Sequence, residues 1–187
     1  MTSAVIRQVA SIQSKCPFAG FRRFILLTMK VQMPTNANIN IRALTRDDFD
    51  AWSPLWNGYN AFYGRQGATA LPIEITKMTW ERFFDPYEPM FAIVAEQNGG
   101  LIGLAHYLYH RSTTQIGPSC YLQDLFTMDK ARGQGVGRRL IGEITKIAKS
   151  EGISRLYWHT YEKNETAMLL YDKVAEKTGV VLYRQVL

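Results

Sequence analysis

Apolar and polar residues alternate over some stretches of this chain and recur every three or four positions over others, which predicts where strands and helices lie. Residues 39–44 alternate and predict a first strand. Residues 91–95 and 101–109 are apolar runs of strand length, and Asn98-Gly99 between them is a strong signal for a tight hairpin turn. These two strands are therefore expected to pair antiparallel.

Two helices are predicted between the first strand and the hairpin. Thr45 is a suitable N-cap, acidic residues follow it, and Gly64 ends the helical period. A shorter helix is expected over 72–84, with Pro72 in its first helical position. The first helix carries an apolar, mainly aromatic stripe at spacings of three and four, formed by Phe49, Trp52, Leu55, Trp56, Tyr59, Phe62 and Tyr63.

The second half of the chain has the pattern of a strand–helix–strand unit. Residues 120–127 predict a strand, and a helical period begins at about Gly137 and ends at Gly152. The next strand, over 153–160, must run parallel to the strand at 120–127 because a helix connects them.

A last helix is predicted from Asn164 to about residue 177, and a strand over 180–186 is expected to close the sheet. The fold class is therefore α/β, with an α+β mixed sheet that is antiparallel in its N-terminal half and holds one parallel strand pair in its C-terminal half. We expect residues 38–187 to form a single domain.

Residues 1–37 are basic, contain serine and lack carboxylates over 1–36, which is typical of a mitochondrial presequence. The alternative is an over-long start assignment, with Met29 or Met33 as the true initiator. In either case this leader is not expected to belong to the fold. The expected location is the cytoplasm, or the mitochondrion if the leader is a genuine presequence.

Composition excludes several classes of protein. No apolar run reaches the roughly 18–20 residues that a membrane span needs. The two cysteines, Cys16 and Cys120, lie far apart and predict free thiols in a reducing compartment. The net charge is +6, but residues 1–36 hold five of the basic residues, so only +1 remains for the rest. We therefore expect no nucleic-acid partner and no membrane partner.

The chemistry of the chain is expected at a glycine-rich loop between the strand at 120–127 and the following helix. Glycines at alternate positions (Gly133, Gly135 and Gly137) allow close approach of a ligand to backbone N–H groups. The helix adds the positive end of its dipole. Three arginines flank the turn, at positions 132, 138 and 139. These features predict a phosphate site, and more specifically a pyrophosphate site.

A dinucleotide-binding loop is one alternative, with Glu162 as a ribose-binding acid. Against it, the spacing is G-x-G-x-G, five residues separate the strand from Gly133, and too little chain follows for the remaining strands. A Walker loop is excluded because no Gly-Lys-Ser/Thr follows. An ordinary glycine-rich turn is the other alternative.

Residues 132–137, Arg-Gly-Gln-Gly-Val-Gly, resemble the acetyl-CoA signature of the GNAT superfamily of N-acetyltransferases. Asn164 and Tyr171 resemble the downstream motif of that family, and residues 121–127 are most similar to its spermidine/spermine and histone/D-amino-acid branch. The resemblance is strong over 119–175 and weak over 38–118.

This resemblance implies that an acceptor amine attacks the thioester of acetyl-CoA directly, with no metal. Pantetheine would pair with the strand backbone beside a bulge, and the loop N–H groups would hold the pyrophosphate. The residues implied for binding the donor are Leu125, Phe126, Thr127, Arg132, Gly133, Gln134, Gly135, Val136, Gly137, Arg138 and Asn164.

Tyr171 is the candidate general acid toward the departing thiolate, since a phenol is a suitable donor to a thiolate in an apolar groove. Packing in the core is the alternative role for Tyr171. The base stays open. Gln123 replaces the glutamate of the polyamine-type enzymes and can only position a water, while Asp124 is expected on the opposite face of the strand.

The amine acceptor is expected beside the aromatic helix, where Trp56, Tyr59 and Tyr63 would contact it, while Trp52 and Phe62 belong to the core. Few acids line this half, which favours a small amine, an amino acid or a peptide amine over a long polyamine. A homodimer through C-terminal strands is implied by related enzymes. A non-catalytic acyl-CoA-binding module is the rival function, and a nucleotide-binding domain is a more distant one.

Overall fold

The computed structural model describes residues 38–187, which belong to one compact unit, Asn36–Leu187. The predicted leader, 1–37, lies outside the described residues. No helix in the described part of the chain is long and apolar enough to cross a membrane.

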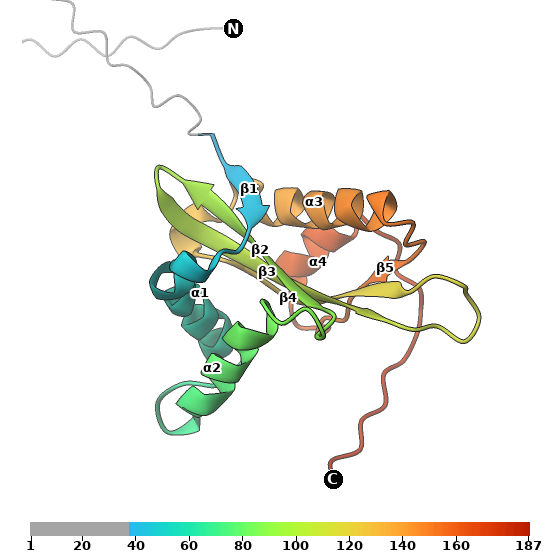
Figure 1. The fold of residues 1–187 in the computed structure, drawn as a ribbon, viewed down its shortest axis with the longest axis horizontal. Helices are drawn as coiled ribbons and strands as arrows, with labels where there is room; N and C mark the ends of the chain where they lie inside the picture. The colour runs from blue at the N-terminus through green and yellow to red at the C-terminus, as the bar shows by residue number, and fades with distance from the viewer. Residues whose placement is uncertain (1–37) are drawn as a thin grey trace, which may run out of the picture. The chain divides into compact units, whose positions relative to one another are not determined.

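A five-stranded sheet with the order β1-β2-β3-β4-β5 forms the centre of this unit (Figure 1). The first three pairings are antiparallel and the β4–β5 pairing is parallel, so the predicted mixed sheet is confirmed. The strands are β1 (Asn40–Ala43), β2 (Met90–Gln97), β3 (Gly100–His110), β4 (Ser119–Thr127) and β5 (Leu156–Tyr157).

The predicted turn between β2 and β3 is confirmed. Asn98 and Gly99 have φ values of 53° and 77°. Left-handed conformation at both central residues is what a type I′ turn requires, and its twist matches that of the two strands. Local sequence therefore sets this hairpin.

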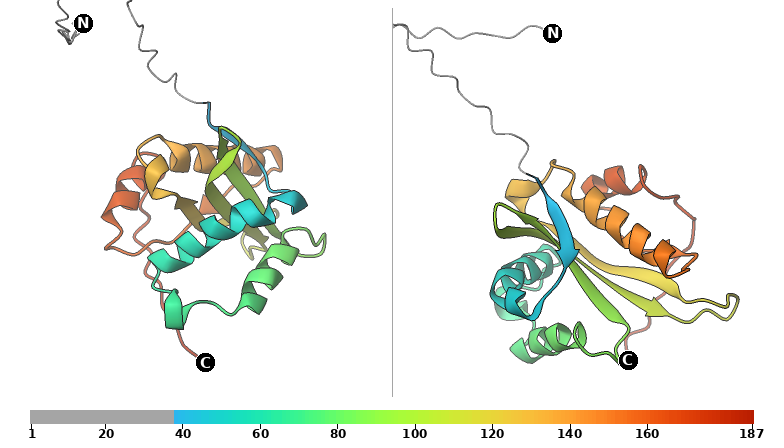
Figure 2. Two further views of the ribbon diagram at one scale, coloured as in Figure 1. Left: turned by 90° about the vertical axis from the view of Figure 1, so that its left-hand side faces the viewer. Right: turned by 45° about the horizontal axis from the view of Figure 1, so that its top comes forward.

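Helices cover both faces of the sheet (Figure 2). On one face, α1 (Phe49–Phe62) and α2 (Ile73–Arg82) bury an aromatic core that includes Trp52 and Trp80. On the other face, α3 (Val136–Ser150) and α4 (Glu165–Tyr171) pack over a mainly aliphatic core that includes Leu140 and Ile144. A 3₁₀ turn, Arg46–Asp48, precedes α1. We expected Pro72 to be the first residue of α2, but it is the N-cap and the helix begins at Ile73.

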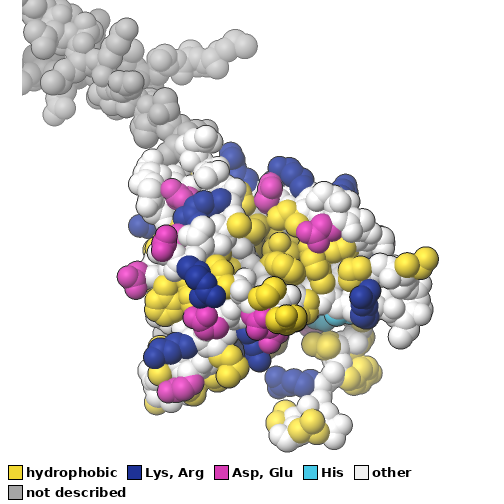
Figure 3. Space-filling view, in the orientation of Figure 1, with side chains coloured by type: hydrophobic (Ala, Val, Ile, Leu, Met, Phe, Trp, Pro, Cys, Tyr) yellow, Lys and Arg dark blue, Asp and Glu magenta, His cyan; other side chains and the backbone are white. Residues whose placement is uncertain are grey.

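The end of the chain departs most from the prediction. The strand expected over 180–186 does not form: these residues have no regular structure, and Val180 and Tyr183 are 77% and 90% exposed. Hydrophobic side chains of this trailing segment are visible in Figure 3. β5 and α4 are also shorter than predicted. A strand needs a hydrogen-bonding edge as well as suitable residues, and even β5 pairs with β4 through only two residues.

Candidate active site

A bulge in β4 sets the geometry of the site. His106 of β3 pairs with Asp124, whereas Tyr107 pairs with Leu122, so Gln123 is an extra residue in the ladder. Leu122 belongs to the core beneath α3, while Asp124 hydrogen-bonds His106, whose ring contacts side chains of the α1 and α2 layer. The bulge therefore resets the alternation of the strand and turns Asp124 toward α1, while Gln123 is exposed.

Strands β4 and β5 separate beyond the bulge. Their pairing comprises only Cys120 with Leu156 and Tyr121 with Tyr157. Among the described residues, 122–127 thus have no strand beside them on the β5 side. Backbone groups on that side need other partners, because buried N–H and C=O groups are costly to leave unpaired. This opening includes Leu125, Phe126 and Thr127, at which the family resemblance implies contacts to pantetheine.

The glycine loop leads into α3 with its N–H groups available. Gly133 and Gly135 have φ values of 75° and 80°, which only glycine adopts at little cost, and Gly135 is the N-cap of α3. The N–H of Arg139 donates to the carbonyl of Gly135 at 3.0 Å and is the first to bond within the helix. The backbone N–H groups of Val136, Gly137 and Arg138 come before it and have no carbonyl of the helix to bind. Such N–H groups at the start of a helix are typical of an anion-binding site.

All three flanking arginines are exposed, but their side chains differ in what they contact. Arg132 forms an ion pair with Asp129 at 2.8 Å, and its side chain is 49% exposed. Arg138 is also exposed. Arg139 instead donates to the carbonyl oxygen of Ile39 at 3.4 Å, so its side chain is directed toward the chain just before β1. Arg132 and Arg138 are therefore the arginines that remain for a phosphate.

Other loop residues contribute through the backbone. Val136 is 1% exposed and its side chain lies in the core, which leaves its N–H for a ligand. A Cβ at Gly137 would lie 3.0 Å from Leu170 Cδ2, so glycine allows α3 to begin close against α4. Gln134 Nε2 donates to the carbonyl of Lys130 at 3.2 Å and braces the loop.

A cavity of about 620 Å³ lies beside this loop. Phe62 is 54% exposed and lines it, so our placement of Phe62 in the core was wrong. The cavity connects α1 with the end of β4 and the loop, and its lining comprises Pro54, Gly58, Ala61, Phe62, Phe126, Met128, Asp129, Lys130 and Arg132. It can accommodate part of a large ligand held by the loop.

Tyr171 lies at the end of α4, with its ring 5.3 Å from that of Trp158. Burial raises the pKa of Tyr171 to about 12, and Tyr63 adds a smaller contribution. The phenol is thus protonated at neutral pH, and it lies within electrostatic range of Tyr63, the C-cap residue of α1. Asn164 is the N-cap of α4 by position, but its side chain donates to Thr160 Oγ1 at 3.2 Å and forms no capping bond.

Asp124 is 7% exposed and belongs to a buried chain of hydrogen bonds. The indole N–H of Trp52 donates to His106 Nε2 at 3.0 Å, and His106 Nδ1 lies 2.9 Å from Asp124 Oδ2. Indole is only a donor, so Nε2 accepts and Nδ1 carries the proton that is donated to Asp124. His106 is therefore neutral. Sequence analysis missed this residue, because its pairing with Asp124 depends on the bulge.

The three aromatic residues expected at the acceptor differ in accessibility. Trp56 is buried, and its indole N–H donates to Thr76 Oγ1 at 3.2 Å. Tyr59 is 8% exposed, and Tyr63 is half-buried with its ring 5.0 Å from that of Tyr59. The pKa of both tyrosines is raised, first by burial and then by the charge of Asp124. Tyr59 and Tyr63 thus lie within electrostatic range of the carboxylate.

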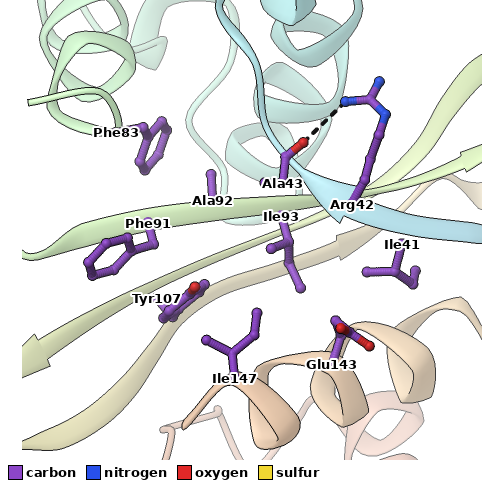
Figure 4. A pocket seen from close by; sticks show the side chains of 10 residues that line it. All are labelled: Ile41, Arg42, Ala43, Phe83, Phe91, Ala92, Ile93, Tyr107, Glu143 and Ile147. Atoms are coloured by element: carbon purple, nitrogen blue, oxygen red, sulfur yellow. Dashed lines mark hydrogen bonds between the residues drawn. The ribbon is translucent and has the colours of Figure 1, made fainter. Parts of the chain in front are cut away.

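A smaller hollow of about 210 Å³ lies near the other edge of the sheet. Figure 4 shows apolar side chains of β1, β2 and α3 converging on it, with the rings of Phe91 and Tyr107 at one end. Its only charged lining residues are Arg42 and Glu143, and it contains none of the predicted site residues.

Residues 51–175 match the family model described as the Acetyltransferase (GNAT) family. The chain belongs to the GNAT family. The D-amino-acid N-acetyltransferase HPA3 of Saccharomyces cerevisiae is 37% identical over 152 residues, which cover 80% of this chain and 92% of HPA3. The thialysine N-epsilon-acetyltransferase of Mus musculus is 32% identical over 79 residues, 41% of this chain and 45% of that protein.

Solved structures share the GNAT fold at low identity. AAC(6')-Iy in complex with a CoA bisubstrate analog has a TM-score of 0.67 and 17% identity, and the match covers 81% of this chain and all of that chain. An aminoglycoside acetyltransferase from an uncultured soil metagenomic sample has a TM-score of 0.65 and 16% identity, covering 79% and 96% of the two chains. The predicted family, fold class and enzyme class are confirmed: the GNAT chain is an N-acetyltransferase, which moves an acetyl group from acetyl-CoA to an amine.

Proposed function

We propose that this N-acetyltransferase binds acetyl-CoA along the open side of β4 and the glycine loop, and that it acetylates the amino group of a small amine or amino acid. The observation that carries the proposal is the continuity of three features: the separated strands, the loop N–H groups and the cavity beside Arg132. The names of the relatives favour an amino-acid acceptor, since one acts on D-amino acids and another on thialysine.

The donor is held mainly by backbone groups. N–H groups of 133–138 bind the pyrophosphate, with Arg132 and Arg138 adding charge-assisted bonds. Backbone groups of Leu125, Phe126 and Thr127 pair with pantetheine and polarise the thioester carbonyl, as an oxyanion hole does. Asn164, the N-cap residue of α4, is assigned to the donor on the family resemblance alone.

Tyr171 acts as the general acid. The amine nitrogen bonds to the thioester carbonyl carbon, the C–S bond then breaks, and the Tyr171 hydroxyl gives its proton to the sulfur. Because burial raises its pKa to about 12, the phenol is protonated at neutral pH and carries the proton that passes to the sulfur as the C–S bond breaks. An incoming ammonium loses two protons in all: one restores Tyr171, and the other leaves through water.

Asp124 and Gln123 together promote deprotonation of the acceptor ammonium, and neither residue takes the proton directly. The buried carboxylate of Asp124 attracts the ammonium group, and Gln123, exposed at the bulge, positions the water that removes the first proton. Direct proton transfer to Gln123 is excluded, because an amide is not basic.

Release of free CoA with a panel of acceptors tests the function. The panel contains polyamines, D- and L-amino acids, aminoglycosides and histone-tail peptides. Tyr171→Phe is expected to lower kcat by about 10²–10⁴-fold with acetyl-CoA affinity unchanged. Tyr87→Phe is the matched control, since Tyr87 is 93% exposed.

Full activity of Tyr171→Phe would refute the assignment of the acid. Binding of acetyl-CoA without turnover of any amine would instead favour an acyl-CoA-binding module. Stronger thermal stabilisation by NAD than by acetyl-CoA would favour a nucleotide-binding domain.

We also propose a homodimer and a cytoplasmic location. The exposed segment 180–186 is rich in the β-branched and aromatic residues typical of a strand, and the edge of a second copy would give it a partner. Light scattering of the full chain and of a chain truncated after residue 178 tests this. A monomeric full chain would exclude the dimer.

The proposed cytoplasmic location is tested separately, by fluorescence microscopy of the full chain fused at its C-terminus to a fluorescent protein.

A further inference from the structure

Arg65 is held in a fixed position at the end of α1. Its backbone N–H donates to the carbonyl of Asn60 at 2.9 Å, and its Nε donates to Asn60 Oδ1 at 2.7 Å. Asn60 is itself 4% exposed and donates to the carbonyl of Trp56 at 2.9 Å. The preceding residue, Gly64, has a φ of 77°, which turns the chain back so that Arg65 can reach Asn60. A buried amide thus orients the guanidinium.

The guanidinium of Arg65 lies against the aromatic part of the site. Its Cζ is 5.4 Å from the ring centroid of Tyr63 and 5.8 Å from that of Tyr59. These contacts occupy its face, and the bond to Asn60 occupies Nε, which leaves the two terminal nitrogens. Within residues 38–187, no carboxylate lies within ion-pair distance of Arg65. Four other arginines in the same part of the chain do have such partners, namely Arg42, Arg46, Arg82 and Arg132, while the remaining arginines there have none.

Asp124 presents the opposite charge to the same two tyrosines. Its carboxylate is buried and receives a hydrogen bond from His106, which is neutral. No cation pairs with it among the described residues. A buried carboxylate without a cation is costly, so the site favours a ligand that brings a positive charge.

The charges of Asp124 and Arg65 both act on the hydroxyl groups of Tyr59 and Tyr63. Asp124 raises the pKa of Tyr59 and Tyr63 and Arg65 lowers it, although burial is the largest influence on both phenols. Both charges therefore lie within electrostatic range of the same two hydroxyl groups. A fixed carboxylate and a fixed guanidinium flanking two phenols form a complement to a molecule that carries both an ammonium and a carboxylate group.

We propose that Arg65 is a specificity-determining residue that binds the carboxylate of a free amino acid, while Asp124 attracts the amino group that is acetylated. The acceptor class is then the zwitterionic amino acids, and amines without a carboxylate, such as polyamines and amino sugars, are poor substrates. This inference rests on the proposed acetyltransferase function.

The test compares an amino acid with its carboxamide, which differ in one charge. The full-length wild type should use phenylalanine, as the D or the L isomer, about 10- to 100-fold better than phenylalaninamide, measured as kcat/KM for CoA release. Arg65→Gln should abolish this ratio, by raising KM for the amino acid and leaving the amide unchanged. Arg65→Lys should restore part of the ratio, because lysine keeps the charge and lacks the planar fork.

Arg46→Gln is the matched control, since Arg46 is an exposed arginine that pairs with Glu81 on the surface, and it should keep the wild-type ratio. Equal use of acid and amide by the wild type would overturn the proposal even if Arg65→Gln failed to fold. An equal loss with both acceptors in Arg65→Gln would also overturn it, since that result indicates a structural role. Absence of turnover with every amine would refute the proposed function itself, so the two failures are distinguishable.

Discussion

Gly103, in β3, is a position where one added methyl group should harm both the fold and the site. It pairs with Thr127 at the end of β4. A Cβ on Gly103 would lie 2.8 Å from Val136 Cγ1, 2.9 Å from the carbonyl oxygen of Phe126 and 3.4 Å from Leu140 Cδ1. The first two contacts are shorter than van der Waals packing allows, so the neighbours must move.

Neither close neighbour can move freely. Val136 is 1% exposed and β-branched, which restricts its side chain to essentially one rotamer in a helix. The Phe126 oxygen is backbone, and Phe126 pairs with Leu104 in the ladder between β3 and β4. Gly103→Ala should therefore cost about 1–3 kcal/mol, the usual penalty for overpacking a core. For a unit of this size, that cost corresponds to a fall in Tm of roughly 2–12 °C.

Urea denaturation of the wild type and Gly103→Ala measures this cost, provided that both show the same m value. Gly142→Ala is the matched control, because its Cβ would meet nothing within 4 Å and it lies in α3. That variant should gain about 1 kcal/mol from helix propensity. Gly103→Ala should also raise the KM for acetyl-CoA, since β4 must shift at Phe126. A Gly103→Ala protein as stable as the wild type would refute the packing argument.

Three further predictions concern separate features of the chain. Gly135 has a φ of 80°, and a Cβ there would meet nothing within 4 Å, so Gly135→Ala adds roughly 1–2 kcal/mol of backbone strain without a clash. This strain should distort the loop and raise the KM for acetyl-CoA about tenfold in a steady-state assay. Gly152→Ala, at φ 71° and remote from the loop, is the control: it should lose similar stability with the KM unchanged. Asp48→Asn should cost about 1–3 kcal/mol at pH 7 in urea denaturation, because hydrogen bonds from an arginine at 2.7 and 2.8 Å hold the pKa of this carboxyl well below its usual range. A carboxyl whose pKa is lower in the folded state stabilises the fold above its unfolded pKa of about 4, and this stabilisation is lost as the pH falls toward the folded pKa. The difference in unfolding free energy between wild type and Asp48→Asn should therefore shrink below about pH 4. A difference that grows there would contradict the assignment. Cys120 is fully buried and its pKa is raised to about 12 by burial, so iodoacetamide at pH 8 should alkylate the peptide containing it only after unfolding, as seen by mass spectrometry.

Local sequence was sufficient for most of the fold. The hairpin at Asn98 was predicted because its turn needs two residues that tolerate positive φ. The parallel pairing of β4 and β5 was predicted because a helix connects them. The strand over 180–186 was predicted wrongly, since a run of residues with strand-forming character does not supply an edge to pair with.

The candidate site was predictable only in part. The glycine loop and Tyr171 were found because phosphate binding and the family motif leave local signals, although the assignment of each role stays a prediction. His106 was missed because it is not part of a motif and its pairing with Asp124 joins distant segments. Arg65 was missed because it is not part of a motif, although its partner Asn60 is close in the sequence. Phe62 was misplaced, because helical period alone does not say where the covered face of a helix ends.

The sequence by itself determined most of the elements, their order, the position of the glycine-rich loop and the family, because these depend on residues close together in the chain. Only the tertiary structure decided which way Asp124 faces. One extra residue in β4 reverses the alternation of the strand, and the register of β3 against β4 places that residue at Gln123. That reversal joins Asp124 to His106 beneath Tyr59 and Tyr63, which is a relation between segments that no local pattern encodes.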